Sequence, residues 1–301
     1  MMATRIYVPC DTTALSMGAD DVARLIEHHA GVQGVAIELV RNGSRGLFWL
    51  EPMVEAGLFD GASGHPLFLG PVADIPYLKR QQRLTFSRIG ITDPLSITDY
   101  RDHGGFDGLE TAISVEPQGI VDEVKVSGLR GRGGAAFPTG IKWQTVHDEP
   151  WQQQKYVVCN ADEGDSGTFA DRLAMECDPY MLIEGMTIAG LAVGATQGFI
   201  YLRSEYPVAH RILNEAIRRA EAEGYLGQDV RGSGRAFDLE VRLAAGAYIC
   251  GEETSLLESL EGKRGLVRAK PPLPAIKGLF GQPTVVNNVL SFAAVPFILA
   301  Q

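Results

Sequence analysis

The chain has 301 residues, 45% of them hydrophobic and 21% charged, which is the composition of an ordinary globular protein with room for about two domains. Its 27 lysines and arginines against 37 aspartates and glutamates give a net charge of −10, which disfavours a nucleic-acid-binding surface because phosphates must be met by clustered cations. The N-terminus lacks the apolar core of a signal peptide, and the longest uncharged run, residues 185–201, is rich in glycine and threonine. We therefore expect a soluble, cytoplasmic protein without a membrane span.

The first 75 residues predict a small domain. The expected elements are a strand over residues 4–8, a helix over 20–29 that ends at Gly31, and strands over 35–40 and 47–50. This order is compatible with a thioredoxin-like domain. Domains of that kind that hold an iron–sulfur cluster need four cysteines, and this one has only Cys10. We expect a docking domain and not a redox centre.

Residues 71–82 are expected to be a linker, and a second domain follows over residues 76–301. The expected elements are strands over residues 155–159, 198–202 and 239–243 and helices over 181–193 and 207–223. Their alternation predicts an α/β fold with a parallel sheet covered on both faces. Two loops follow strands directly, at residues 160–167 and 246–255. In open α/β sheets ligands bind at that edge.

A glycine-rich loop precedes these strands, with five glycines and two arginines between Gly128 and Trp143. Glycine lets the backbone approach a ligand closely, and a run of N–H groups forms an anion-binding concavity that the start of a helix reinforces. The Rossmann form of such a loop follows a strand, whereas apolar residues at helical spacing precede this one. It is therefore a candidate phosphate loop of another kind, and a plain surface loop is the alternative that these residues leave open.

Three further segments admit structural explanations as well as functional ones. The acidic loop at 160–167 could be an ordinary turn or a site for a ribose or ribityl group. The adjacent Glu252 and Glu253 could be a solvated pair, and the basic, proline-rich residues 263–274 could be a surface strap. The cysteines show no C-x-x-C spacing and predict neither a disulfide framework nor a metal site. They are Cys10, Cys159, Cys177 and Cys250.

Four separated motifs coincide in this chain. They are GLRGRGGAAFPTGIKW, NADEGDSGTFADR, GAYICGEETSLLESLEGKRG and KPPLPAIKGLFGQPTVVNNV. Together they resemble the FMN-binding, NADH-oxidising flavoprotein subunit of respiratory complex I and its relatives in NAD-reducing hydrogenases and NAD-dependent molybdenum formate dehydrogenases. The resemblance covers residues 84–301. The first domain without cluster cysteines and the NADEGDSG variant are most similar to the β subunit of the soluble formate dehydrogenases.

The resemblance implies a thioredoxin-like domain over residues 1–75 and a Rossmann-like FMN/NADH-binding domain over residues 76–301 with a mainly parallel sheet. It implies a diaphorase module that exchanges hydride between NAD(H) and FMN and single electrons with iron–sulfur centres of a larger complex. That complex is expected to be an NAD-dependent formate dehydrogenase, with complex I or an NAD-reducing hydrogenase as alternatives. Expected partners are an iron–sulfur subunit with a thioredoxin-like [2Fe–2S] domain and a molybdenum subunit that acts on formate.

Family members continue into a ubiquitin-like domain and a helical domain that ligates a [4Fe–4S] cluster. Because this chain stops at Gln301, we expect a truncated chain with no metal site of its own. A rival of another class is a flavin-less assembly subunit, and retention of every flavin motif argues against it. A phosphoryl-transfer enzyme would need a G-x-x-x-x-G-K-[ST] loop, which is absent.

The motifs also carry site residues over to this sequence. The FMN site would comprise Gly131, Arg132, Gly133, Gly134, Lys142, Asn160, Asp162, Tyr248, Gly251, Glu252, Asn287 and Asn288. The NADH site would comprise Phe137, Asp165, Glu253 and Lys270. No catalytic side chain is expected, because the flavin itself carries the hydride chemistry. The chain departs from many relatives at Asp165, where they have Glu, and from some at Thr145 and Leu273, where they have Phe.

Overall fold

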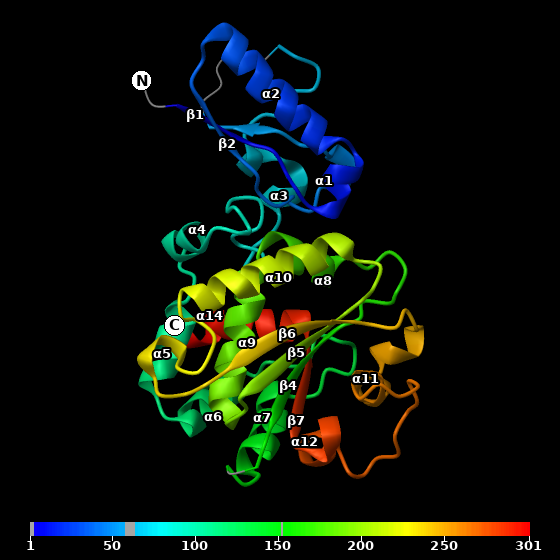
Figure 1. Ribbon diagram of the computed structural model, residues 1–301. Helices are drawn as coiled ribbons and strands as arrows, with labels where there is room; N and C mark the ends of the chain where they lie inside the picture. Colours follow the sequence, from blue (N-terminus) through cyan, green and yellow to red (C-terminus); the bar gives the residue numbers. More distant parts are fainter. Residues whose placement is uncertain (1–2, 58–63, 152) are drawn as a thin grey trace. The chain divides into compact units, whose positions relative to one another are not determined.

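The computed structural model describes residues 3–57, 64–151 and 153–301, which form two compact units, Met1–Asp93 and Pro94–Gln301 (Figure 1). The boundary between the units lies later than the residue 75 that the sequence predicted. The segment expected to be a linker contains two short helices of the first unit, η2 (Val72–Asp74) and α3 (Pro76–Lys79).

The first unit is built on a three-stranded sheet in the order β2-β1-β3. β1 (Thr4–Tyr7) runs parallel to β2 (Ile37–Val40) and antiparallel to β3 (Glu55–Ala56). The short helix α1 (Thr12–Ser16) and the longer α2 (Ala19–Gln33) connect β1 to β2. A small core of buried residues lies between sheet and helices, and it consists of Val8, Ala14, Ala19 and Ala23. The predicted strand, helix and second strand are confirmed here, whereas the thioredoxin-like identity stays a prediction.

Two expectations for this unit are wrong. Helix α2 does not end at Gly31 but continues to Gln33, because Gly34, with φ of 66°, is the residue that takes the left-handed C-cap conformation. Residues 47–50 are not a strand, since Phe48–Leu50 form the 3₁₀ helix η1. The Leu50 N–H donates to the Leu47 carbonyl at 2.8 Å, so this backbone is satisfied locally and not by a sheet partner.

The second unit contains a four-stranded sheet, entirely parallel, in the order β6-β5-β4-β7. This confirms the predicted α/β fold with a mainly parallel sheet. The strands are β4 (Tyr156–Ala161), β5 (Gln197–Leu202), β6 (Asp238–Leu243) and β7 (Thr284–Asn288). The sequence predicted the first three and missed β7. In register, Asn160 at the end of β4 pairs with Asn288 at the end of β7.

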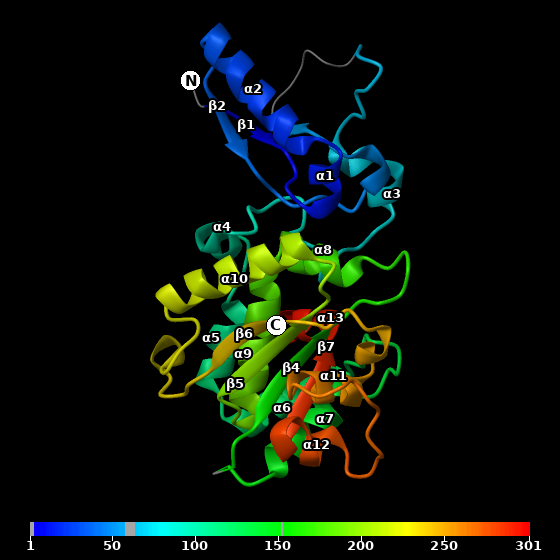
Figure 2. The same cartoon turned by 45° about the vertical axis from the view of Figure 1, so that its right-hand side comes forward.

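Helices cover both faces of this sheet, as predicted (Figures 1 and 2). On one face, Leu256 and Leu257 of α11 (Glu253–Leu260) pack against Val158, Tyr201 and Val286 of the strands. On the other face lies α9 (Pro179–Val193), a largely apolar helix that is buried along its whole length and carries the buried Glu184. No helix of the described ranges is long and apolar enough to cross a membrane.

The remaining helices surround this layered core. They are α4 (Ile97–Asp102), α5 (Asp107–Ser114), α6 (Pro117–Val126), α7 (Thr139–Asp148), α8 (Ala170–Cys177), α10 (Pro207–Ala222), α12 (Pro274–Lys277), α13 (Val289–Ala293) and α14 (Val295–Leu299), with the 3₁₀ turns η3 (Val230–Gly232), η4 (Tyr248–Gly251) and η5 (Leu279–Gly281). The predicted helices over residues 181–193 and 207–223 are confirmed as α9 and α10.

Candidate functional site

The candidate site lies where β4 and β7 end side by side. Parallel strands bring their carboxyl ends to one edge of a sheet, and here that edge carries Asn160 and Asn288 as cross-strand partners. The Asn160 Nδ2 donates a hydrogen bond to the Gly251 carbonyl at 2.8 Å. The strand ends and the loop before α11 therefore form one continuous surface.

The glycine-rich loop is closed on itself and packs against the end of β7. The Gly131 N–H donates to the Phe137 carbonyl and the Thr139 N–H to the Leu129 carbonyl, both at 2.9 Å. Gly134 has φ of 106°, a conformation that side chains other than glycine rarely adopt. A Cβ built on Gly133 would lie 3.3 Å from the Asn288 Cβ, so a side chain there would push against the strand end. Helix α7 begins directly after the loop.

Two side chains of α7, together with one loop N–H, bind this region to β7 and the helix after it. Lys142 Nζ donates to the Val286 carbonyl at 2.7 Å, and the buried Trp143 Nε1 donates to Asn287 Oδ1 at 3.1 Å. The Arg132 N–H donates to the hydroxyl of Ser291 at 2.9 Å. Burial lowers the pKa of Lys142, and the carboxylate of Glu253, 3.6 Å from its Nζ, opposes that shift.

Asp162, in the loop after β4, supplies an unpaired acceptor next to Gly251. Its Oδ2 is buried and makes no hydrogen bond with the described part of the chain. Burial raises its pKa to about 6, a shift that Arg203 opposes. A Cβ on Gly251 would lie 3.6 Å from the Asp162 carbonyl oxygen, so the backbone approaches closely here. A buried acceptor that has no partner beside a glycine cradle fits a ligand that brings its own N–H or O–H donor, as a flavin ring or its ribityl chain does.

Four charged side chains form a paired cluster at the start of α11. Glu252 caps the helix, accepting from the Thr254 N–H at 2.8 Å and the Ser255 N–H at 2.9 Å. Lys270 Nζ lies 3.1 Å from a Glu252 oxygen and 2.7 Å from a Glu253 oxygen, and Lys142 reaches Glu253 from the other side. Burial alone would raise the pKa of Glu252, but hydrogen bonds from Thr254, Ser255 and Lys270 bring it below its ordinary value. The two glutamates are thus a structured pair and not a solvated one.

Tyr248 and Asp165 meet at the outer edge of the site. The Tyr248 hydroxyl donates to Asp165 Oδ1 at 2.7 Å, and a Cβ on Gly164 would lie 2.9 Å from the Tyr248 ring. The ring therefore lies over Gly164 while remaining largely exposed to solvent. Phe137 belongs to the glycine-rich loop, where its carbonyl accepts from the Gly131 N–H and its ring is half exposed.

Sequence reasoning missed two buried acids behind the strand ends. Glu163 accepts from the N–H groups of Asp171 and Arg172, both at 3.0 Å, and thereby caps α8. Asp171 accepts from Asn288 Nδ2 at 2.6 Å. Its burial, reinforced by Glu163, raises the pKa of Asp171 to about 7. Glu163 stands in the acidic loop that the sequence singled out, but its role as a helix cap depends on a fold that the pattern did not specify.

The fold and these contacts define an α/β protein with a closed glycine-rich loop and a buried polar cradle at the carboxyl edge of a parallel sheet. Residues 124–297 match the family described as the Nuo51 FMN-binding domain, and the chain belongs to this family. FMN is therefore its cofactor. The resemblance seen in the sequence is confirmed.

Named relatives show where such domains occur. The chain is 54% identical over 207 residues to the F subunit of the NADH-quinone oxidoreductase of Aquifex aeolicus, an alignment that covers 68% of this chain and 48% of that protein. It is 50% identical over 221 residues to the HndC subunit of the NADP-reducing hydrogenase of Solidesulfovibrio fructosivorans, covering 73% of this chain and 45% of that protein. The chain spans about half the length of the curated relatives it matches.

A solved structure is also similar to this chain in fold and sequence. The crystal structure of an NAD⁺-reducing [NiFe]-hydrogenase in the H₂-reduced state superposes with a TM-score of 0.59 at 30% sequence identity, covering 98% of this chain and 52% of the other.

Proposed function

We propose that this chain is the flavin module of a multi-subunit NAD(H) oxidoreductase. The observation that carries the proposal is that the buried Oδ2 of Asp162, next to Gly251, has no hydrogen-bond partner in the described part of a chain that belongs to the Nuo51 FMN-binding family. The named relatives are subunits of quinone-linked and hydrogen-linked enzymes, which supports an electron-transfer role in a larger assembly. When bound, FMN supplies hydride exchange with NAD(H) and one-electron exchange with iron–sulfur centres.

The residues that would hold FMN differ in the part of the cofactor that each would contact. The Gly131 and Arg132 N–H groups already donate to Phe137 and Ser291, so the closed loop offers the N–H groups of Gly133 and Gly134 to the 5′-phosphate, with the Arg132 guanidinium adding charge. Asp162 and the strand-end amides receive the hydroxyl and N–H donors of the cofactor. The remaining residues proposed for the FMN site are Lys142, Asn160, Tyr248, Gly251, Glu252, Asn287 and Asn288.

NAD(H) would be held by the more exposed groups. Lys270 offers a cation to the diphosphate, Glu253 offers a carboxylate to ribose hydroxyls, and the half-exposed Phe137 offers a ring face. Asp165, already bonded to Tyr248, lies on the same exposed side. Lys270 is the most informative of these because its two contacts are both carboxylates of the cluster.

The test is steady-state oxidation of NADH with ferricyanide as acceptor. Lys270→Ala should raise the KM for NADH by an amount equivalent to about 1–3 kcal/mol, the scale of a charge-assisted hydrogen bond, with FMN content unchanged. The exposed Lys277→Ala, in α12, is the matched control and should leave KM unchanged. Loss of FMN with no change in KM among the remaining holoprotein would overturn the assignment of Lys270 to NADH.

The identity of the wider complex is a second question. The NADEGDSG loop and the single cysteine of the first unit favour a formate dehydrogenase, with an iron–sulfur subunit and a molybdenum subunit as partners. Co-purification would decide, because a molybdenum partner indicates formate, a nickel–iron partner indicates hydrogen and membrane subunits indicate quinone. A purified chain that is colourless and does not take up FMN would instead support a flavin-less assembly role.

A further inference from the structure

The segment that joins α11 to α12, residues 261–273, carries Lys270 yet has no regular secondary structure. We call this segment the strap. In the described chain, no N–H group of residues 264–272 donates to a backbone carbonyl. Leu266, Val267 and Leu273 are exposed, and a cavity of about 330 Å³ lies beside the strap. Neither backbone bonding nor apolar packing therefore accounts for where most of the strap lies.

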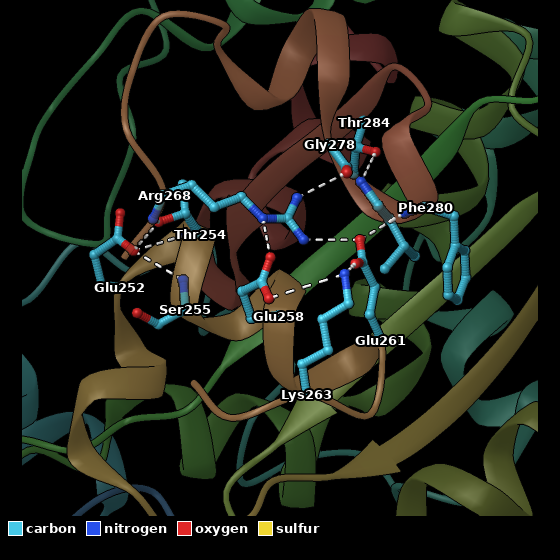
Figure 3. Close-up of polar contacts among 11 residues, drawn as sticks. Glu252, Thr254, Ser255, Glu258, Glu261, Lys263, Arg268, Gly278, Phe280 and Thr284 are labelled. Atoms are coloured by element: carbon cyan, nitrogen blue, oxygen red, sulfur yellow. Dashed lines mark hydrogen bonds and ion pairs between the residues drawn. The ribbon is translucent and has the colours of Figure 1, made fainter. Parts of the chain in front are cut away.

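Arg268 supplies the missing contacts (Figure 3). Its Nε donates to Glu258 at 2.5 Å and its Nη2 donates to Glu261 at 2.8 Å, both near the C-terminal end of α11. Its Nη1 donates to the Gly278 carbonyl at 2.9 Å, beyond α12. One planar guanidinium thus joins the strap to the structures on both sides of it, a geometry that a lysine cannot reproduce.

The backbone of Arg268 connects the strap to the charged cluster. Its N–H donates to Thr254 Oγ1 at 2.9 Å, and the same hydroxyl donates to Glu252 at 2.5 Å. Glu252 in turn contacts Lys270. Because two residues span at most about 7 Å of chain, fixing Arg268 also restricts where the Lys270 side chain begins.

We propose that Arg268 is a positioning residue for NAD(H): it holds the strap so that the Lys270 ammonium stays at the mouth of the site. The inference rests on the proposed contact between Lys270 and NAD(H). Arg268 itself touches neither FMN nor substrate, since its three guanidinium contacts point to α11 and to the Gly278 carbonyl.

The experiment is a double-mutant cycle on the FMN-loaded chain. Arg268→Gln should raise the KM for NADH about tenfold, equivalent to about 1.4 kcal/mol, with kcat and the FMN dissociation constant within about twofold of wild type. In a Lys270→Ala background the same substitution should change KM by less than about twofold, because its effect acts through Lys270. Arg268→Lys should give an intermediate KM, since a point charge can satisfy only part of the fork.

Lys263→Ala is the matched control. Lys263 also pairs with Glu261, at 2.6 Å, but its side chain is 58% exposed and it makes no contact that reaches Lys270 among the described residues. It should leave KM within about twofold of wild type, the scale of a surface ion pair. Hydrogen exchange should show faster exchange of the residue-268 amide, which donates to Thr254 Oγ1, in Arg268→Gln and wild-type exchange of that amide in Lys263→Ala.

The outcomes separate the two hypotheses. If Lys270→Ala leaves KM unchanged, the proposed NAD(H) contact is wrong. If Lys270→Ala raises KM but Arg268→Gln does not, or if the two effects multiply, Arg268 is a structural residue only and this inference is overturned while the proposed function stands. Loss of FMN in both Arg268→Gln and Arg268→Lys would also overturn it.

Discussion

The indole N–H of Trp143 donates to the side-chain oxygen of Asn287 although 144 residues separate them in sequence. Trp143 is fully buried and follows the glycine loop, whereas Asn287 lies at the end of β7. This hydrogen bond leaves the amide group of Asn287 with a fixed orientation at the edge where we propose that FMN binds. The loop and the strand are therefore coupled by a single defined contact.

Trp143→Phe should weaken both folding and FMN binding. The substitution leaves the buried oxygen of Asn287 without its donor, which costs about 1–3 kcal/mol of unfolding free energy. Urea denaturation would measure the loss and fluorescence titration the change in FMN affinity. Trp49→Phe, at a tryptophan that is 65% exposed, is the control and should be close to neutral. Equal effects of the two substitutions would contradict the coupling.

Gly133→Val should block FMN binding without unfolding the chain. Its Cβ would lie 3.3 Å from the Asn288 Cβ, and the two methyl groups beyond it would fill the space over the loop. We expect the dissociation constant for FMN to rise by at least about tenfold, or about 1.4 kcal/mol. Gly119→Val is the control, because a Cβ there meets only Val115 at 3.8 Å. Wild-type FMN affinity in Gly133→Val would remove this loop from the site.

The buried carboxyl of Asp171 should make stability depend on pH. Its folded pKa of about 7 lies above the ordinary value of 3.8, so between these values the folded chain binds more protons than the unfolded one. Stability must then fall as pH rises through that window, by at most about 4 kcal/mol. Asp171→Asn keeps an acceptor for Asn288 and removes the titration, so its advantage over wild type should appear between pH 4 and pH 7.

The measurement is the difference in unfolding free energy between Asp171→Asn and wild type, taken at intervals from pH 4 to pH 8. Glu163, whose carboxylate meets the Asp171 N–H, and the buried Cys159 thiol stay in place in both proteins. Asp21→Asn, at a side chain that is 71% exposed, supplies the baseline. A difference that does not vary with pH would show that Asp171 is ionised throughout.

The chain of residues 1–301 should hold no iron–sulfur centre. Cys159, Cys177 and Cys250 are buried in β4, α8 and η4, three separate elements, and Cys10 lies in the other unit. Burial raises the pKa of the Cys159 thiol, which disfavours the thiolate that an iron ligand requires. Iron analysis and low-temperature electron paramagnetic resonance on the dithionite-reduced chain would test this. A stoichiometric cluster signal would contradict it.

Periodicity and turn chemistry predicted much of the second unit, and for clear physical reasons. The strands at 156–161 and 197–202 are bounded by polar residues, and α9 and α10 are long enough to show their pattern. Strand β7 was missed because Pro283 precedes only three residues of strand character before the two asparagines. In the first unit, the sequence allows helix α2 to end at either Gly31 or Gly34, and the folded backbone shows that Gly34 is its C-cap.

The candidate site was likewise predicted from the sequence only in part. Motifs named the loop and the strand-end amides, but contacts between distant segments were invisible to them. The contact of Asp171 with Asn288 joins residues 117 apart that the sheet order brings together. The cap that Glu163 makes on α8 and the bond from the Arg268 N–H to Thr254 span 8 and 14 residues, and they depend on the folded path of the chain between them. The residue types alone do not show which charged side chains make such contacts and which are solvated.

The position of β7 also sets an order of events during synthesis. The synthesis of β4, β5 and β6 is complete at residue 243, but the strand that completes the cradle against β4 ends only at Asn288. A nascent chain holding the glycine loop and the acidic loop must wait for more than forty further residues before the cofactor has a place to bind. Flavin capture is thus a late step, and ribosome-bound chains arrested before residue 284 should emerge without the cofactor while already folded around three strands.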